Sequence, residues 1–163
     1  MGDPRKQKRK FAKPKHLWKV SRIEEENALT KEYGLKNKRE IWRARSRLRG
    51  FRQQARSLLA ATGESAEKEK KELAGKLNRL GILEGKNFDD VLGLEVKNIL
   101  ERRLQTLTVK KGLASTPKQA RQLIAHKHVR VGGRVMNTPG YLVPKAHEDL
   151  IALDETYAKK VAK

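Results

Sequence analysis

One spacing pattern constrains this chain more than any other feature of its sequence. Apolar side chains recur at alternating steps of three and four at Ile41, Ala44, Leu48, Phe51, Ala55 and Leu58. This period places one apolar face on an α-helix, which we expect to begin at Asn37-Lys-Arg-Glu40 and to end by Gly63. The other faces carry arginine and no lysine after Lys38. A guanidinium forms paired hydrogen bonds with phosphate, so this face indicates RNA contact, the alternative being a merely solvated surface.

The charge of the chain is strongly unbalanced, at +20. Residues 1–62 hold 19 basic and 6 acidic residues, residues 63–98 hold 7 and 8, and residues 99–163 hold 13 and 5. A charge of this size repels itself in a free monomer, and it therefore favours a polyanionic partner such as nucleic acid. Two basic regions around a neutral bridge predict two RNA-facing surfaces on one compact body.

Composition also limits the class of protein. With 163 residues and 37% apolar content, the chain can build about one modest core, and hence one or two small domains. The absence of cysteine excludes disulfide frameworks and thiolate zinc sites. No apolar run reaches the length of a signal-peptide core or a bilayer span, which predicts a soluble intracellular protein.

The first 20 residues combine a dense run of cations with two prolines and with Phe11, His16 and Trp18. We expect an extended basic arm that adds nothing to the core, is solvated and disordered in the free protein, and becomes ordered on RNA. Aromatic rings spaced among cations can stack on unpaired bases while the cations meet phosphates.

Two further helices are expected in the N-terminal part. Ser21-Arg-Ile-Glu24 has the form of a capping box and Gly34 that of a helix stop, which predicts about three turns between them. The run Glu24-Glu25-Glu26 is then interpreted as first-turn acids that complement the helix dipole. Another helix should run from about Ala66 to Leu80, with an apolar side made of Leu73, Leu77 and Leu80.

The C-terminal third shows two more helical patterns. Leu100, Leu104 and Leu107 share one helical face and Arg103 lies on another, so we expect one helix from Val96 to Gly112. Thr116-Pro-Lys-Gln119 then supplies a cap, a proline at the first helical position and a glutamine at the third. This second helix should end near His126, with Ala120, Leu123 and Ile124 facing inward and an outward stripe of Lys118, Arg121, Gln122 and Ala125.

The segment from Val129 to Met136 has the pattern of a β-hairpin around Gly132-Gly133. The alternation of apolar residues favours a three-residue loop that pairs Val131 with Val135 and leaves Arg130 and Arg134 exposed. Residues 141–143 and 150–153 should complete a small antiparallel sheet. The predicted fold is therefore α+β, with a helical N-terminal region and a two-helix module on a short antiparallel sheet.

Several motifs within residues 99–153 resemble, in order and spacing, the RNA-binding module of the S-four family: Glu101-Arg-Arg-Leu, Lys111-Gly-Leu-Ala-Ser-Thr116, Gln119-Ala-Arg-Gln-Leu-Ile124, His126 and Val131-Gly-Gly133. Upstream motifs resemble the archaeal and eukaryotic-type ribosomal member of that family: Gly2-Asp-Pro-Arg-Lys6, Ile23-Glu-Glu-Glu26, Tyr33-Gly-Leu35, Asn37-Lys-Arg-Glu40, Phe51-Arg-Gln-Gln-Ala-Arg56 and Asp89-Asp-Val-Leu-Gly93. The chain departs from the module at Gln105, Pro117, Lys127 and Gly132, where Asp, Arg, Gly and Asn are common.

This resemblance implies a structural constituent of the small ribosomal subunit in the cytoplasm. Such a protein binds small-subunit ribosomal RNA at a helical junction, nucleates assembly and supports translation accuracy. The resemblance also implies contact with a neighbouring ribosomal protein of the S-five family and proximity to the path of messenger RNA. It implies no membrane, no small-molecule substrate, no cofactor and no structural zinc.

We expect four units: a basic arm (1–20), a helical N-terminal domain (21–98), an RNA-binding domain (99–153) and a C-terminal tail (154–163). The residues expected to contact ribosomal RNA are Arg5, Lys6, Arg9, Lys10, Arg43, Arg45, Arg47, Arg49, Arg52, Arg56, Arg102, Arg103, Thr116, Lys118, Arg121, Gln122, His126, Lys127, Arg130 and Arg134.

Two other functions are alternatives to this one. The same module occurs as an appendage of RNA-modifying enzymes, but the scattered histidines offer no converging catalytic groups, so we expect no enzyme. For His126 and His128 no third metal ligand stands out in the sequence, and helix capping with phosphate contact is preferred. A ribosome-associated or recycling factor is the other alternative, although the long arginine-rich helix and the arm exceed what a small factor needs.

The charge layout makes RNA affinity strongly dependent on salt. Each phosphate contact releases condensed cations, so we expect binding to small-subunit RNA to fall on the order of a thousandfold between about 50 and 200 mM salt. Filter binding across a salt series measures this dependence. A nearly flat profile would contradict the polyanion interpretation.

Overall fold

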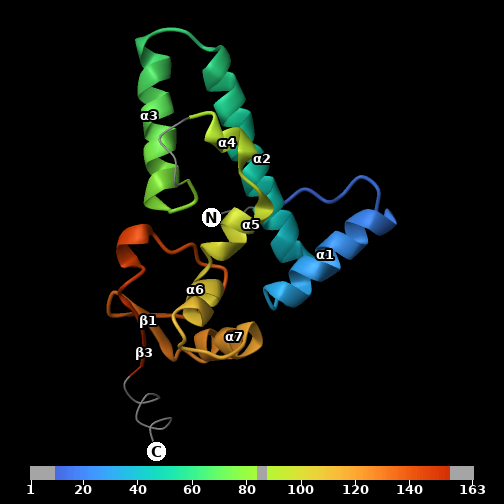
Figure 1. The fold of residues 1–163 in the computed structure, drawn as a ribbon, viewed down its shortest axis with the longest axis vertical. Coiled ribbons are helices and arrows are strands. Elements are labelled where there is room, and N and C mark those ends of the chain that lie inside the picture. Colours follow the sequence, from blue (N-terminus) through green and yellow to red (C-terminus); the bar gives the residue numbers. More distant parts are fainter. Residues whose placement is uncertain (1–9, 84–87, 155–163) are drawn as a thin grey trace, which may run out of the picture.

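A computed structural model describes residues 10–83 and 88–154 (Figure 1). The helices are α1 (Val20–Glu32), α2 (Lys38–Ala60), α3 (Glu64–Arg79), α4 (Asp90–Gly93), α5 (Val96–Glu101), α6 (Leu104–Lys110) and α7 (Pro117–Ala125); the strands are β1 (Val129–Val131), β2 (Arg134–Met136) and β3 (Ile151–Leu153), with a 3-10 helix η1 at Lys145–His147. The predicted α+β class is confirmed. Among the described helices, none is long and apolar enough to cross a membrane.

The N-terminal core is built along α2. All six residues of the predicted apolar stripe are buried. They form one cluster with Leu73 and Leu77 of α3, Val91 of α4 and Leu100 of α5. Burial of each large side chain contributes about 1.5–3 kcal/mol, so this stripe suffices to hold the long helix in place. Figure 1 shows α2 and α3 running side by side, with α4 and α5 placed against α2.

The two ends of α1 differ in how well the sequence predicted them. Gly34 adopts φ +57°, and the Leu35 amide donates to the Thr30 carbonyl at 3.0 Å, which is the expected glycine-type helix stop. The predicted capping box is wrong, because α1 begins at Val20 and Ser21 lies inside it. With that start the first turn contains no acid, so the interpretation of Glu24-Glu25-Glu26 as first-turn acids is also wrong.

The described part of the arm, residues 10–19, lies against α2 and the start of α1. The Ala12 amide donates to Ser46 Oγ at 3.0 Å, and the Phe11 ring lies 5.9 Å from the Trp42 ring. Arg22 donates to the Leu17 carbonyl at 2.8 Å. One aromatic ring and several backbone groups thus tie this segment to the helices, although none of residues 10–19 belongs to the hydrophobic core clusters.

The single helix predicted from Val96 to Gly112 is in fact two helices, with a break at Arg102 and Arg103. At the start of α6 the Leu104 amide donates to the Tyr141 carbonyl at 2.8 Å, and the Gln105 amide donates to the Pro139 carbonyl at 3.3 Å. These bonds to a distant loop replace the bonds to residues four positions earlier that an unbroken helix would form.

A second core begins just after this break. It consists of Leu104, Leu107, Ala114, Ala120, Leu123, Ile124, Val129, Val131, Val143 and Ile151. The predicted start of α7 is confirmed, since Thr116 Oγ1 accepts from the Gln119 amide at 3.2 Å and Pro117 occupies the first turn. The inward face of α7 is buried as expected. The strands form an antiparallel sheet in the order β2-β1-β3.

The sheet differs from the prediction in two places. Val131 pairs with Arg134 and not with Val135, so the hairpin loop has two residues. Both loop glycines have positive φ, at 55° and 79°, which is the conformation a two-residue turn requires. This backbone preference outweighed the side-chain alternation. Residues 141–143 do not form a strand of the sheet, and Leu142 instead makes an isolated bridge with Arg103.

Gly34 offers a sharp test of how the N-terminal helices pack against the C-terminal module that contains α6, α7 and the sheet. A Cβ added at Gly34 would lie 2.7 Å from Pro117 Cβ of α7, and the positive φ is unfavourable for alanine. We expect Gly34→Ala to lower the free energy of unfolding by about 1–3 kcal/mol in urea titrations. Gly50→Ala in α2 is the matched control. Nothing lies within 4 Å of its added Cβ, so alanine should raise stability by about 0.5–1 kcal/mol. Equal effects of the two substitutions would contradict this packing.

Candidate nucleic-acid interface

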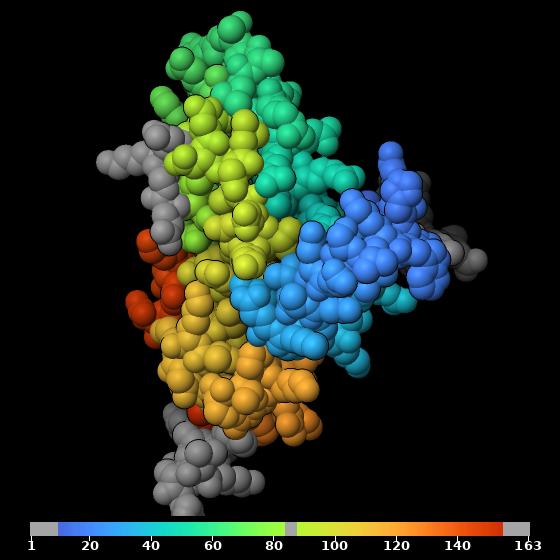
Figure 2. Space-filling view, turned by 45° about the vertical axis from the view of Figure 1, so that its right-hand side comes forward, coloured from blue at the N-terminus to red at the C-terminus, as the bar shows by residue number. Residues whose placement is uncertain are grey.

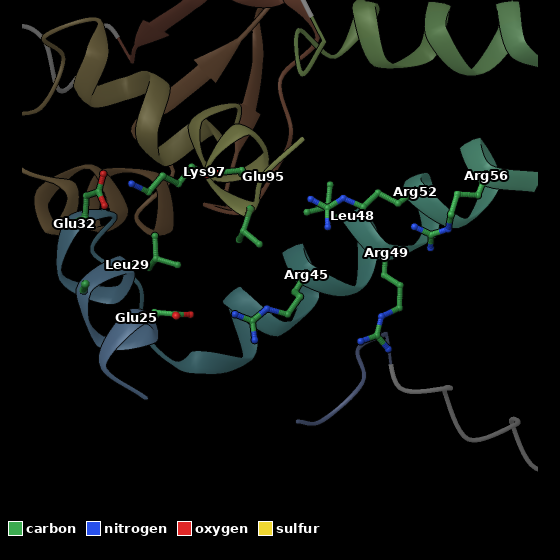
Figure 3. A pocket seen from close by; sticks show the side chains of 12 residues that line it. Glu25, Leu29, Glu32, Arg45, Leu48, Arg49, Arg52, Arg56, Glu95 and Lys97 are labelled. Carbon is green, nitrogen blue, oxygen red and sulfur yellow. The ribbon is translucent and has the colours of Figure 1, made fainter. Parts of the chain in front are cut away.

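The α2 arginines form two stripes. Arg45, Arg49, Arg52 and Arg56 line a groove of about 820 Å³ between α2, α1 and the start of α5. Figure 3 shows these four side chains in succession along α2, with Glu25 and Glu32 of α1 across the groove. Arg43 and Arg47 form the second stripe and are exposed. Steps of three or four residues within each stripe keep its members on one side of the helix.

The two partly buried arginines of α2, Arg45 and Arg52, also have partners within the protein. Arg52 donates to the Leu94 carbonyl at 2.5 Å, and Arg45 lies 3.6 Å from the carboxylate of Glu26. Glu26 is fully buried and accepts from Arg22 at 2.7 Å and from Trp42 Nε1 at 3.0 Å. Arg49 and Arg56 are exposed and are better placed than Arg45 and Arg52 to meet an external anion.

Glu40 joins the two halves of the molecule. The sequence placed Glu40 in the helix-start signal Asn37-Lys-Arg-Glu40, but Asn37 caps α2 without a side-chain hydrogen bond. The Glu40 carboxylate instead accepts hydrogen bonds from Arg103, which lies between α5 and α6, and from Arg121 of α7, the latter at 2.8 Å. Burial alone would raise the pKa of Glu40, but the hydrogen bonds and charges of Arg121 and Arg103 outweigh it, and the pKa lies below its ordinary value.

Gln105 completes this junction and was missed as a functional residue by the sequence analysis. Its side chain is buried, and Nε2 lies 3.0 Å from the Tyr33 carbonyl, 3.1 Å from the Gly34 carbonyl and 2.9 Å from the Pro117 carbonyl. These oxygens need an N–H donor, which the aspartate common at this position in the module could not supply. The departure from the module's pattern was the signal that could have found it.

The predicted outward position of Arg121 is wrong, because its guanidinium faces Glu40, as does that of Arg103. Arg103 is 6% exposed, and Arg121 also donates to Gln105 Oε1 at 3.3 Å. Arg102 is likewise occupied. It donates to Glu148 at 2.7 Å, to the Leu80 carbonyl at 2.9 Å and to the Val143 carbonyl at 3.2 Å. These three arginines hold the fold together, which a count of cations cannot reveal.

The remaining side chains of the C-terminal set lie on the surface of α7 and the hairpin. Exposed members are Thr116, Lys118, Gln122, His126, Lys127 and Arg134. Arg130 forms an ion pair with Asp154 at 2.5 Å and is only partly exposed. Arg5, Lys6 and Arg9 lie outside the described residues, while Lys10 is exposed. Exposed cations thus lie on α7 and the hairpin as well as on α2.

Across residues 10–83 and 88–154, no group of three or more metal-ligating side chains is placed to hold an ion. The rings of His126 and His128 stack with their centroids 6.2 Å apart.

Figure 2 shows α1 against the module that contains α6 and α7, so the exterior there is a continuous surface.

Comparison with known proteins finds a family model and several relatives that match this chain. The model of the S4 domain matches residues 102–150. The small ribosomal subunit protein uS4 of Methanococcus aeolicus is 53% identical over 154 residues, covering 93% of this chain and 87% of that protein. Its namesake from Hyperthermus butylicus is 50% identical over 163 residues, covering 98% and 93%. That of Sulfurisphaera tokodaii is 52% identical over 153 residues, covering 93% and 86%.

The Glu40 junction predicts a pH dependence of stability. Because the folded-state pKa of Glu40 is depressed, its contribution is present above about pH 4.5 and is lost as the pH falls through the folded-state value. We expect Glu40→Gln to lower the free energy of unfolding at neutral pH by about 3–5 kcal/mol, since two arginines lose a charged partner. The variant should also lack this part of the acid sensitivity.

Urea titrations at pH 7 and at a series of lower pH values measure both effects. Glu64→Gln on α3 is the control, because that carboxylate is 82% exposed and its ion pair should contribute less than about 1 kcal/mol. If Glu40→Gln unfolds at the wild-type midpoint, the junction does not hold the halves together.

Proposed function

Because the chain belongs to the small ribosomal subunit protein uS4 family, we propose that it is a structural constituent of the small subunit that binds ribosomal RNA directly. The relatives are ribosomal structural proteins, and their similarity to this chain extends far beyond the S4 domain. The observation that carries the proposal is the presence of exposed cations both on α2 and on α7 with the hairpin. These surfaces are held in one body by the bonds of Glu40 to Arg103 and Arg121.

The proposed RNA contacts are a corrected form of the sequence-based set. On α2 they are Arg43, Arg47, Arg49 and Arg56, with Arg45 and Arg52 at the groove. On the module they are Thr116, Lys118, Gln122, His126, Lys127, Arg130 and Arg134, and Lys10 belongs to the arm. We assign Arg102, Arg103 and Arg121 to positioning, because a guanidinium that is paired with a partly buried carboxylate has less capacity left for phosphate. For Arg5, Lys6 and Arg9 the proposal rests on charge alone.

Two cationic surfaces on different elements suit an RNA in which helices meet. Each surface can bind one phosphate backbone, and the rigid connection through Glu40 then favours a single relative orientation of the RNA helices. We therefore propose binding at a helical junction, with nucleation of subunit assembly and support of translation accuracy as consequences. The same proposal places the protein in the cytoplasm, beside a ribosomal protein of the S-five family and near messenger RNA.

A ribosome-associated or recycling factor that uses the same module is the second candidate. Identity of about half over 93% or more of the chain to small-subunit proteins favours a permanent constituent, since a shared module alone would match only its own residues. We likewise propose no catalytic activity, no cofactor and no small-molecule substrate.

Co-sedimentation and chemical footprinting test this proposal together. We expect the protein to stay with small subunits through a high-salt wash, because a constituent enclosed by folded RNA is also held by packing that salt does not screen. On isolated small-subunit RNA it should protect nucleotides in at least two helices that meet at one junction. Loss in the wash would favour the recycling factor. Protection of one isolated helix, or of none, would contradict the junction.

A further inference from the structure

The arm does more than carry charge, because it encloses a space against α2. Three contacts fix its path. Phe11 lies against Trp42, with their ring centroids 5.9 Å apart, and the Cζ of Arg43 is 5.9 Å from the centre of the Phe11 ring. The Ala12 amide is bonded to Ser46. Arg22 donates to the carbonyls of His16 and Leu17 at 3.3 and 2.8 Å.

The enclosed space is a cationic pocket of about 360 Å³. Its charged lining consists of Lys13, Lys15, Lys19, Arg22, Arg45 and Arg49. Its other lining residues are neutral or aromatic, and Arg22 and Arg45 are turned in part toward the buried Glu26. Several cations around one small concave space create a strongly positive potential there, which selects an anion.

An exposed indole lies at the rim of this pocket. Trp18 is 87% exposed, and the neighbouring Leu17 and Val20 are 53% and 66% exposed. A shallow surface lined by Lys15, His16, Leu17, Trp18 and Lys19 shares three of its residues with the cationic pocket. The arm's two ring systems thus have different roles: Phe11 anchors the arm, whereas Trp18 is presented to the exterior beside lysines.

We propose that the arm and α2 form a site for one unpaired nucleotide of RNA, with its phosphate in the cationic pocket and its base stacked on Trp18. The inference rests on the proposed RNA-binding function and specifies which RNA element this face takes. An aromatic face beside a cationic groove is the combination that binds single strands without regard to sequence, because every base has a π-face. A paired base has both faces covered, so duplex RNA gains nothing from Trp18.

A protein partner is disfavoured by the charge of the surroundings. Protein interfaces are depleted in lysine at their centres, whereas Lys15 and Lys19 flank Trp18 here. Desolvating them against a neutral protein surface would cost free energy, while an RNA phosphate would neutralise them. Docking of another protein is therefore an outcome that the test must separate from nucleotide binding.

The test measures the affinity of the full chain for hexauridylate and for a short RNA duplex. Trp18→Ala should weaken hexauridylate binding roughly 5- to 100-fold, leave duplex binding within about twofold and leave the melting temperature unchanged. Trp18→Phe should restore most of the affinity, because it restores an aromatic face. Leu59→Ala is the control, since Leu59 is an exposed apolar residue on α2, away from the arm.

The phosphate half of the site has its own measurement. Lys15→Gln and Lys19→Gln should each reduce the slope of log affinity against log salt by about 0.7 for hexauridylate. Trp18→Ala should leave that slope unchanged. Lys71→Gln on α3 removes one charge elsewhere and should leave the slope unchanged as well.

The site is overturned if Trp18→Ala binds hexauridylate as the wild type does, if it weakens duplex and single strand equally, or if Trp18→Phe fails to recover affinity. Unchanged RNA affinity combined with poorer incorporation of Trp18→Ala into small subunits would assign the surface to a protein and also overturn it. Wild-type binding to complete small-subunit RNA separates the two proposals. If the wild type binds that RNA tightly and the substitutions leave hexauridylate affinity unchanged, only the nucleotide site is contradicted. If the wild type does not bind that RNA, the proposed function is contradicted.

Discussion

The carboxylate of Glu40 is the interaction on which the rest of this structure depends. It draws together Arg103 and Arg121, which lie 63 and 81 residues further along the chain. The two hydrophobic cores meet at this point, because one cluster ends with Leu100 and the other begins at Leu104. A partly buried carboxylate with a single cation would leave acceptor capacity unused, whereas two guanidiniums and the nearby Gln105 share a connected polar network. That network fixes how the module sits on α2.

This arrangement also explains how a chain of charge +20 folds before its partner arrives. Some of its arginines form ion pairs within the protein: Arg22 and Arg45 with Glu26, Arg103 and Arg121 with Glu40, and Arg102 with Glu148. The cations left outside are spread over α2, the arm and α7, where water and salt screen them. Internal neutralisation and external binding therefore use the same residue type for opposite purposes.

Sequence reasoning was most successful where one local signal decided the outcome. The apolar stripe of α2 fixed a buried face, and Thr116 with Pro117 fixed the start of α7, because each depends on residues within a few positions. It failed at the Ser21 box, at the unbroken Val96–Gly112 helix and at the hairpin register. In the second case the loop at Pro139 and Tyr141 supplies the hydrogen-bond acceptors, and no local pattern contains that information.

The sequence by itself determined the α+β class, the faces of the two main amphipathic helices, the excess of cations and the resemblance to a ribosomal family. These follow from periodicity, from end signals and from composition, all of which are properties of neighbouring residues or of sums. Only the tertiary structure decided which arginines meet carboxylates and which remain for phosphate, and which aromatic ring of the arm is an anchor and which is exposed. The physical reason is that a guanidinium's role depends on the charge it faces, and here that charge lies on a distant segment of the chain.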